Sequence, residues 1–191
     1  RTLGSNLTDS LYILDEPSVG LHPRDTGRLL TVLESLRDLG NTVVIVEHEE
    51  EVIRAADHLV DMGPLAGHLG GEVIFQGPIA DAYVSKESLT AKYLREELSV
   101  EVPARRRKAL HKIEITGASQ HNLKDVSATF PLNTLTVVTG VSGSGKTTLV
   151  KKILYPALSR HINNVGDKPG SFDELLGDVD QLTQVEMIDQ N

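Results

Sequence analysis

The sequence predicts an α/β fold built on a parallel sheet, with a small antiparallel β subdomain. Short apolar runs typical of strands buried on both faces occur at residues 11–14, 42–46 and 135–139. Between the first two runs, residues 24–39 carry leucines and valines near helical spacing, and Gly40 follows where a C-terminal glycine stop belongs. A strand, a helix and a strand within about 35 residues form a βαβ crossover, which makes the two strands parallel.

The composition is that of an ordinary globular protein, since 39% of the 191 residues are hydrophobic and 24% are charged. The sequence contains no cysteine, which excludes disulfides and thiolate zinc sites from this stretch. No apolar run approaches the roughly 18 residues needed to span a bilayer, and there is no charged-then-apolar leader. These features predict a cytoplasmic protein without membrane contact.

Smaller elements follow the second apolar run, and then the composition changes. Residues 99–110 contain Pro103 and show no hydrophobic periodicity, which indicates a linker or a domain boundary. Before this linker the sequence predicts a short helix at 50–56, small strands at 59–62 and 71–77, and an amphipathic helix over 79–98. Beyond it the sequence predicts antiparallel strands at 112–116 and 126–130, a helix at 146–161, a surface segment at 163–180 and the start of a strand at 184–188.

The formal net charge of −8 gives the chain as a whole no electrostatic footprint for nucleic acid. One run departs from this acidic balance, at Arg105, Arg106, Arg107 and Lys108. We interpret the run as a solvated linker, with a phosphate-contacting patch as the alternative.

Residues 140–147 match the phosphate-binding loop pattern G-x-x-x-x-G-K-[ST] without a gap. Its glycines let the backbone curl so that successive N–H groups point at the β- and γ-phosphates of a nucleotide. The helix expected to begin at Lys146 directs the positive end of its dipole at the same anion. Lys146 is expected to neutralise phosphate charge and the Thr147 hydroxyl to ligand Mg²⁺. The candidate nucleotide-binding residues are Gly140, Val141, Ser142, Gly143, Ser144, Gly145, Lys146, Thr147 and Thr148.

A carboxylate pair closes the first apolar run. Residues 11–16 form an apolar strand that ends in Asp15 and Glu16, the shape of a Walker B motif. Asp15 is expected to hold the magnesium shell, and Glu16 to polarise the attacking water as general base. Acidic residues at strand ends also cap helices or bind nothing, so the motif needs its context.

These residues together resemble the ATP-binding cassette ATPases, which implies a P-loop NTPase core. Asp15 and Glu16 followed by His48 are similar to the C-terminal half of a cassette domain, in which His48 would sense the γ-phosphate. A lone histidine at a strand end is otherwise more often structural. Three further runs, Ser-Val-Gly-Leu-His at 18–22, Val-Glu-His-Glu at 46–49 and Arg-Ala-Ala-Asp-His at 54–58, narrow the resemblance to the UvrA family of excinuclease ABC proteins. Runs at 61–64, 70–72 and 122–124 extend the resemblance over residues 11–190.

The order of the motifs fits that family, whose members carry two cassettes in one chain. The resemblance implies that residues 1–98 are the C-terminal half of the first cassette domain, 99–110 a linker, and 111–191 the N-terminal half of the second. Gln190 then matches the Q-loop glutamine, a magnesium and water ligand, with a surface glutamine as the alternative. A Leu-Ser-Gly-Gly signature, zinc cysteines and a second Walker B motif are missing from the sequence, so the isolated segment is expected to be inactive.

The resemblance implies an ATPase that uses ATP and Mg²⁺ within the DNA damage-recognition protein of an excision nuclease system for DNA repair. In the full-length protein it implies three partners, namely damaged DNA, the protein UvrB and a second UvrA molecule. It also implies zinc, held outside this segment. Two alternatives remain, a UvrA-like paralogue used in drug self-resistance and the ATPase of an ABC transporter. The glycine in the 18–22 run and the tandem order of the motifs argue against the transporter.

Overall fold

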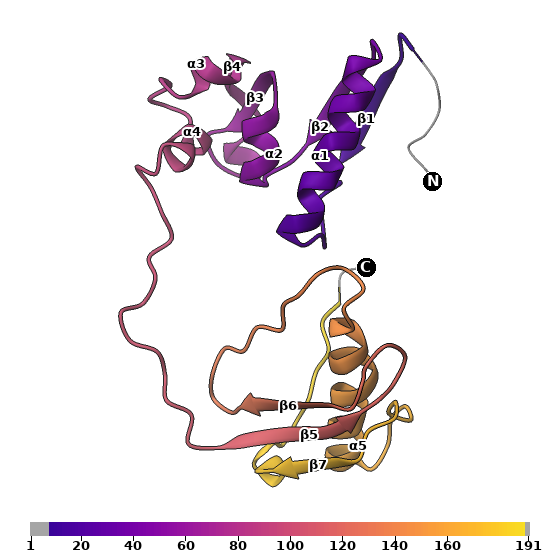
Figure 1. Ribbon diagram of the computed structural model, residues 1–191. Coiled ribbons are helices and arrows are strands. Elements are labelled where there is room, and N and C mark those ends of the chain that lie inside the picture. Colours follow the sequence, from indigo (N-terminus) through magenta and orange to yellow (C-terminus); the bar gives the residue numbers. More distant parts are fainter. Residues whose placement is uncertain (1–7, 190–191) are drawn as a thin grey trace. The chain divides into compact units, whose positions relative to one another are not determined.

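The computed structural model describes residues 8–189, which divide into two compact units between Val102 and Pro103 (Figure 1). Unit 1 precedes this point and unit 2 follows it. Each unit has its own secondary structure and its own buried residues, and each contains one of the motif groups identified in the sequence.

Unit 1 begins with the predicted crossover. Strand β1 (Leu11–Asp15) pairs with β2 (Thr42–Val46) in parallel, in a register that runs from Leu11 opposite Thr42 to Asp15 opposite Val46. Helix α1 (Pro23–Asp38) connects them and lies alongside the pair (Figure 1). The helix starts with His22 as N-cap, whose Nδ1 accepts from the Arg24 amide at 3.2 Å, and with proline at its first position, where no amide is needed.

The strands β1 and β2 were expected to be buried on both faces, and this expectation is wrong for the described chain. Alternate side chains of both strands are exposed, among them Leu11, Ile13, Val44 and Val46. The physical reason is the size of the sheet, which contains only these two strands among residues 8–189. Helix α1 covers one face through Leu33 and Leu36, which are both buried.

The rest of unit 1 is a hairpin with short helices. Strands β3 (His58–Gly63) and β4 (Glu72–Pro78) are antiparallel, and the 3₁₀ turn η1 (Gly67–Leu69) lies between them in the chain. Helix α2 (Glu50–Ala55) precedes this hairpin. The helix predicted over 79–98 is in fact two short helices, α3 (Ile79–Ala82) and α4 (Leu89–Leu94). The break occurs because the Ser88 hydroxyl caps α4 by accepting from the Ala91 amide at 2.8 Å.

Residues 99–110 form neither helix nor strand, and the basic side chains at 105–108 within them are exposed. This stretch contains the boundary between the two units.

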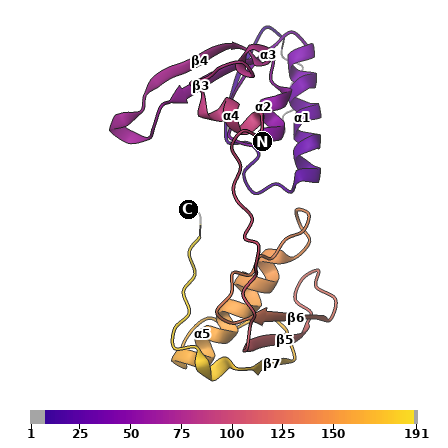
Figure 2. The same cartoon turned by 90° about the vertical axis from the view of Figure 1, so that its left-hand side faces the viewer.

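Unit 2 is a three-stranded antiparallel sheet packed against one long helix (Figure 2). The strands are β5 (Lys112–Ala118), β6 (Val126–Pro131) and β7 (Glu174–Gly177), in the spatial order β6-β5-β7. The helix begins at Lys146, continues through the π-helical segment η2 (Thr148–Leu154) and ends with α5 (Tyr155–Asn163). A 3₁₀ turn, η3 (Val179–Gln181), follows β7. Ile115 of the sheet and Ile153 of the helix are fully buried at the centre of the core.

Two strands predicted in this half of the sequence are not formed. Residues 135–139 have no regular structure, and Leu135 is 95% exposed. Residues 184–188 likewise form no strand. A strand of a parallel sheet is held by hydrogen bonds to its neighbours, and within residues 8–189 nothing pairs with either run. The mixed α/β character, with one parallel and two antiparallel sheets, is confirmed.

Residues 8–189 include no helix with both the length and the apolar character that a bilayer crossing requires.

Candidate functional site

The loop at residues 140–147 curls tightly before it enters the long helix of unit 2, which starts at Lys146. Three of its glycines have positive φ, 146° at Gly140, 75° at Gly143 and 103° at Gly145. Residues with a Cβ rarely adopt these conformations, so the path of the loop depends on glycine. The Leu149 amide then donates to the Gly145 carbonyl at 2.9 Å, which joins the end of the loop to the first turn of the helix.

The side chain of Lys146 folds back against its own loop. Its ammonium group donates to the carbonyl oxygens of Gly140 at 2.7 Å and Val141 at 2.9 Å. A hollow of about 270 Å³ lies beside it, bordered by Asn122, Gly143, Gly145, Lys146, Thr147 and Thr148. Five residues singled out in the sequence therefore surround one space, while Gly140, Val141, Ser142 and Ser144 complete the loop.

Asn122 belongs to this hollow, although the sequence analysis gave it no role there. It lies in the turn between β5 and β6, and its side-chain amide donates to the Gly143 carbonyl at 2.9 Å. A Cβ added at Gly145 would lie 2.7 Å from Cδ2 of Leu123 and 3.3 Å from Oδ1 of Asn122. A side chain at position 145 would therefore displace the end of Leu123, and the φ of 103° independently disfavours any residue other than glycine there.

In unit 1, Asp15 and Glu16 lie at the carboxyl end of β1. Asp15 forms the last residue pair of the parallel ladder, opposite Val46. Glu16 follows with a positive φ of 44°, and its amide donates to the Val46 carbonyl at 2.9 Å. Both carboxylates thus lie at the edge of the sheet where parallel α/β folds bind their ligands.

The structure brings Glu16 and His48 together. Nδ1 of His48 lies 3.9 Å from Oε1 of Glu16, and the two side chains are 74% and 51% exposed. That separation is too long for a hydrogen bond. Because both side chains are this exposed, the contact contributes little to stability. What it establishes is that the two side chains lie close together.

Glu47 is a second residue whose role the sequence did not indicate, although it lies in the run at 46–49. Its carboxylate accepts hydrogen bonds from three backbone amides, those of Ser18 at 2.8 Å, His48 at 3.1 Å and Glu49 at 3.4 Å. Burial alone would raise the pKa of Glu47, but the hydrogen bonds from Ser18, His48 and Glu49 outweigh it, and the pKa is lowered. Glu47 is therefore a charged link between the segments that follow β1 and β2.

The candidate magnesium ligands are distributed over both units. Asp15 lies in unit 1, the Thr147 hydroxyl belongs to the residues around the hollow of unit 2, and Gln190 falls outside the described residues. Over residues 8–189 no three histidine, aspartate or glutamate side chains form a group that could hold a metal ion. Mg²⁺ at a nucleotide usually takes only one or two protein oxygens beside the phosphates, so a single hydroxyl or carboxylate at each motif fits this chemistry.

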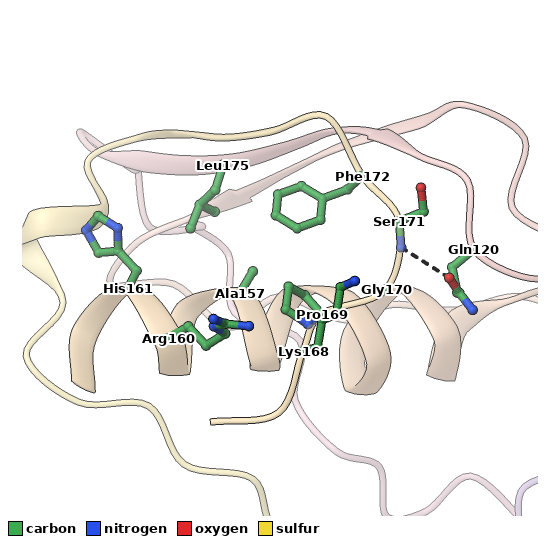
Figure 3. Close-up of a pocket in the computed structure, with 10 residues that line it drawn as sticks. All are labelled: Gln120, Ala157, Arg160, His161, Lys168, Pro169, Gly170, Ser171, Phe172 and Leu175. Carbon is green, nitrogen blue, oxygen red and sulfur yellow. Dashed lines mark hydrogen bonds between the residues drawn. The ribbon is translucent and has the colours of Figure 1, made fainter. Parts of the chain in front are cut away.

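A larger hollow of about 840 Å³ lies along α5 (Figure 3). Basic side chains of Arg160, His161 and Lys168 line it together with apolar ones such as Phe172. The Ser171 amide donates to Gln120 at 3.1 Å on its border. None of the candidate site residues lines this hollow.

The chain is closely similar to proteins of one family. It is 53% identical over 190 residues to UvrABC system protein A of Staphylococcus epidermidis, a match that covers 99% of the chain and 20% of the relative. UvrABC system protein A of Deinococcus radiodurans is 52% identical over 190 residues, with 99% and 19% covered. No family model matches the chain.

Among solved structures, the crystal structure of UvrA2 from Deinococcus radiodurans matches with a TM-score of 0.86 and 45% sequence identity. This match covers 95% of the chain and 22% of that structure's chain. The chain thus spans about a fifth of the length of the relatives it matches.

Proposed function

The chain belongs to the family of UvrABC system protein A, and from that premise we propose that it is part of the ATP-binding and ATP-hydrolysing machinery of a DNA damage-recognition protein in nucleotide excision repair. The whole protein would be a cytoplasmic ATPase that acts with damaged DNA, UvrB and a second copy of itself. The observation that carries the nucleotide part of this proposal is the loop at 140–147, which curls around the Lys146 ammonium group at the start of a helix.

We assign residues 1–98 to the C-terminal half of a first cassette, 99–110 to a linker, and 111–191 to the N-terminal half of a second. The motif order supports this assignment, because the Walker B carboxylates precede the phosphate loop in the chain. The division of the chain into two compact units, with one motif group in each, supports the same assignment.

At the second cassette, the loop amides and Lys146 would bind the β- and γ-phosphates of ATP. Lys146 now donates to two neutral carbonyls, and a phosphate would give its charge a charge-assisted partner instead. Because the helix starts at Lys146, its unpaired amides and dipole favour an anion at the same place. The Thr147 hydroxyl and Gln190 would supply oxygen ligands to Mg²⁺, which neutralises phosphate charge when bound.

At the first cassette, Asp15 would join the magnesium shell and Glu16 would take a proton from the attacking water. His48 would contact the γ-phosphate from the carboxyl end of the neighbouring strand. The 3.9 Å approach of His48 to Glu16 supports this division of roles, since both groups must face the same phosphate.

The test is Lys146→Ala in the full-length protein that carries this segment. Loss of a charge-assisted contact worth about 1.5–3 kcal/mol predicts roughly tenfold to 150-fold weaker ATP binding at the second cassette. Isothermal titration measures it, with Lys152→Ala as the control, because Lys152 is an exposed lysine of the same helix outside the hollow. Equal affinity of Lys146→Ala and wild type at that site would refute the assignment.

A further inference from the structure

Glu47 lies directly after β2 and is half-buried between two segments of unit 1. One carboxylate oxygen, Oε1, accepts from the Ser18 amide at 2.8 Å, in the segment that follows β1. The other oxygen, Oε2, accepts from the His48 amide at 3.1 Å and the Glu49 amide at 3.4 Å, in the segment that follows β2. Each oxygen therefore holds a different segment, and the side chain bridges them.

Only an ionised carboxylate can make this bridge. Both of its oxygens are acceptors, whereas glutamine has one acceptor oxygen and would turn an NH₂ group toward backbone N–H groups. The lowered pKa of Glu47 agrees with a carboxylate that stays charged. Because its oxygens already accept three hydrogen bonds, Glu47 is a poor proton acceptor. It is therefore not an alternative to the exposed Glu16 as the general base.

The segments that Glu47 joins carry the two candidate catalytic side chains. Glu16 is two residues before Ser18, and His48 follows Glu47 directly. Glu16 has a left-handed φ of 44°, a strained conformation that persists only where the surroundings fix it. The hydrogen bond from its amide to Val46 is one such restraint, and the Glu47 bridge is the next along the chain.

We propose that Glu47 is a positioning residue, which holds the Glu16 segment and the His48 segment in register and thereby sets the rate of ATP hydrolysis at the first cassette without touching the nucleotide. This inference rests on the proposed roles of Glu16 and His48. It predicts an effect on kcat and not on KM, because the bridge places the hydrolytic groups and leaves the phosphate loop of that cassette alone.

The experiment uses the full-length protein with Lys146→Ala, at ATP concentrations that saturate the first cassette but leave the weakened second cassette largely empty, so that the hydrolysis measured comes from the first cassette. Glu47→Ala should lower kcat by about tenfold to a hundredfold, the cost of a displacement near 1 Å, with KM within about threefold of the parent. Glu47→Gln keeps one acceptor oxygen and the side-chain volume, so its kcat should lie between that of the parent and that of Glu47→Ala. Glu51→Ala, which removes an exposed carboxylate from the first turn of α2, should leave both constants unchanged.

Hydrogen exchange provides a second measurement. In Glu47→Ala the amides of Ser18 and His48 should exchange faster, while those of β3 and β4 keep their rates. If Glu47→Ala keeps the kcat of Glu51→Ala, or if kcat falls only in proportion to the folded fraction, the inference is overturned. If Glu47→Ala does not fold, Glu47→Gln takes its place, and a kcat equal to that of Glu51→Ala overturns the inference. Glu16→Gln distinguishes failure of this inference from failure of the proposed function. If hydrolysis survives Glu16→Gln, the proposed role of Glu16 itself is contradicted.

Discussion

The side-chain amide of Asn122 donates a hydrogen bond of 2.9 Å to the carbonyl oxygen of Gly143. It thereby joins the turn after β5 to the middle of a loop whose glycines would otherwise leave it many conformations. Leu123 packs on the same loop, at 2.7 Å from where a Cβ of Gly145 would be. The antiparallel sheet of unit 2 therefore helps to shape the loop at 140–147 as well as covering the helix.

The first prediction concerns this hydrogen bond. If the loop at 140–147 binds ATP as proposed, Asn122→Ala should weaken that binding by roughly three- to tenfold, because a hydrogen bond that pre-orders the loop is worth about 1 kcal/mol. Titration of the full-length protein with ATP measures the affinity. Lys124→Ala, an exposed change in the same turn, is the control. Equal affinities for the two variants would show that the loop keeps its shape without Asn122.

Ser88 provides a stability prediction for unit 1. Its fully buried hydroxyl donates to Oδ2 of Asp61 at 2.6 Å and accepts from the Ala91 amide at 2.8 Å, so it both caps α4 and ties it to β3. Ser88→Ala should lower the free energy of unfolding by about 1–3 kcal/mol, because it removes the cap and leaves a carboxylate short of a donor.

Urea unfolding of the chain, followed by circular dichroism, measures this loss. Ser35→Ala is the matched control, since that hydroxyl is exposed on α1 and bonds only the preceding turn, to the Thr31 carbonyl at 2.7 Å. If Ser88→Ala and Ser35→Ala unfold at the same urea concentration, the Ser88 cap does not stabilise unit 1.

Asp178 provides a pH prediction for unit 2. The backbone hydrogen bond from the Lys112 amide at 2.9 Å, together with His111 at 3.2 Å, lowers the pKa of Asp178 from its usual 3.8. Because the folded pKa is the lower one, the stabilisation is fully present above about pH 4 and is lost as pH falls through the folded value. Asp178→Asn should remove this part of the acid dependence.

The measurement is the melting temperature of the chain between pH 2 and pH 6. Wild type should lose more stability toward acid than Asp178→Asn, and the two curves should converge at the lowest pH. Asp167→Asn, a change at an exposed aspartate of unit 2, should follow wild type. Parallel curves for wild type and Asp178→Asn would exclude a contribution from Asp178.

Local patterns in the sequence predicted much of this fold. The crossover at 11–46, the hairpin strands near 58–63 and 72–78, and the strands at 112–118 and 126–131 all lie within a few residues of their predicted places. Each depends on periodicity or turn chemistry within a short stretch of chain. The run at 135–139 has the apolar character of a strand, but strand formation also needs a neighbour, and composition does not provide one.

Contacts between distant residues explain what the sequence did not predict. Strand β7 forms because it pairs with β5, some 60 residues earlier, as in the pairing of Glu174 with Thr116. Asn122 and Glu47 matter through partners 21 and 29 positions away, Gly143 and Ser18, which no local spacing connects. Motif residues such as Lys146 could be proposed from the sequence because the chemistry expected of them depends on a fixed local spacing.

The last prediction concerns the four basic residues at 105–108, which are exposed in a segment without helix or strand. Against a net charge of −8 they are the one concentrated positive run, so DNA binding by this 191-residue chain should be weak and should depend on salt. With at most four phosphates neutralised, the slope of log K against log salt should be no steeper than about −3.6.

Replacing all four basic residues at 105–108 with alanine should abolish the binding. Replacing the scattered Arg24, Arg28, Lys86 and Lys124 should leave most of it, because dispersed charges do not follow a phosphate backbone. Filter binding over a salt series measures both. Nanomolar affinity at physiological salt, or equal loss in the two quadruple variants, would mean that this run is not what contacts the DNA.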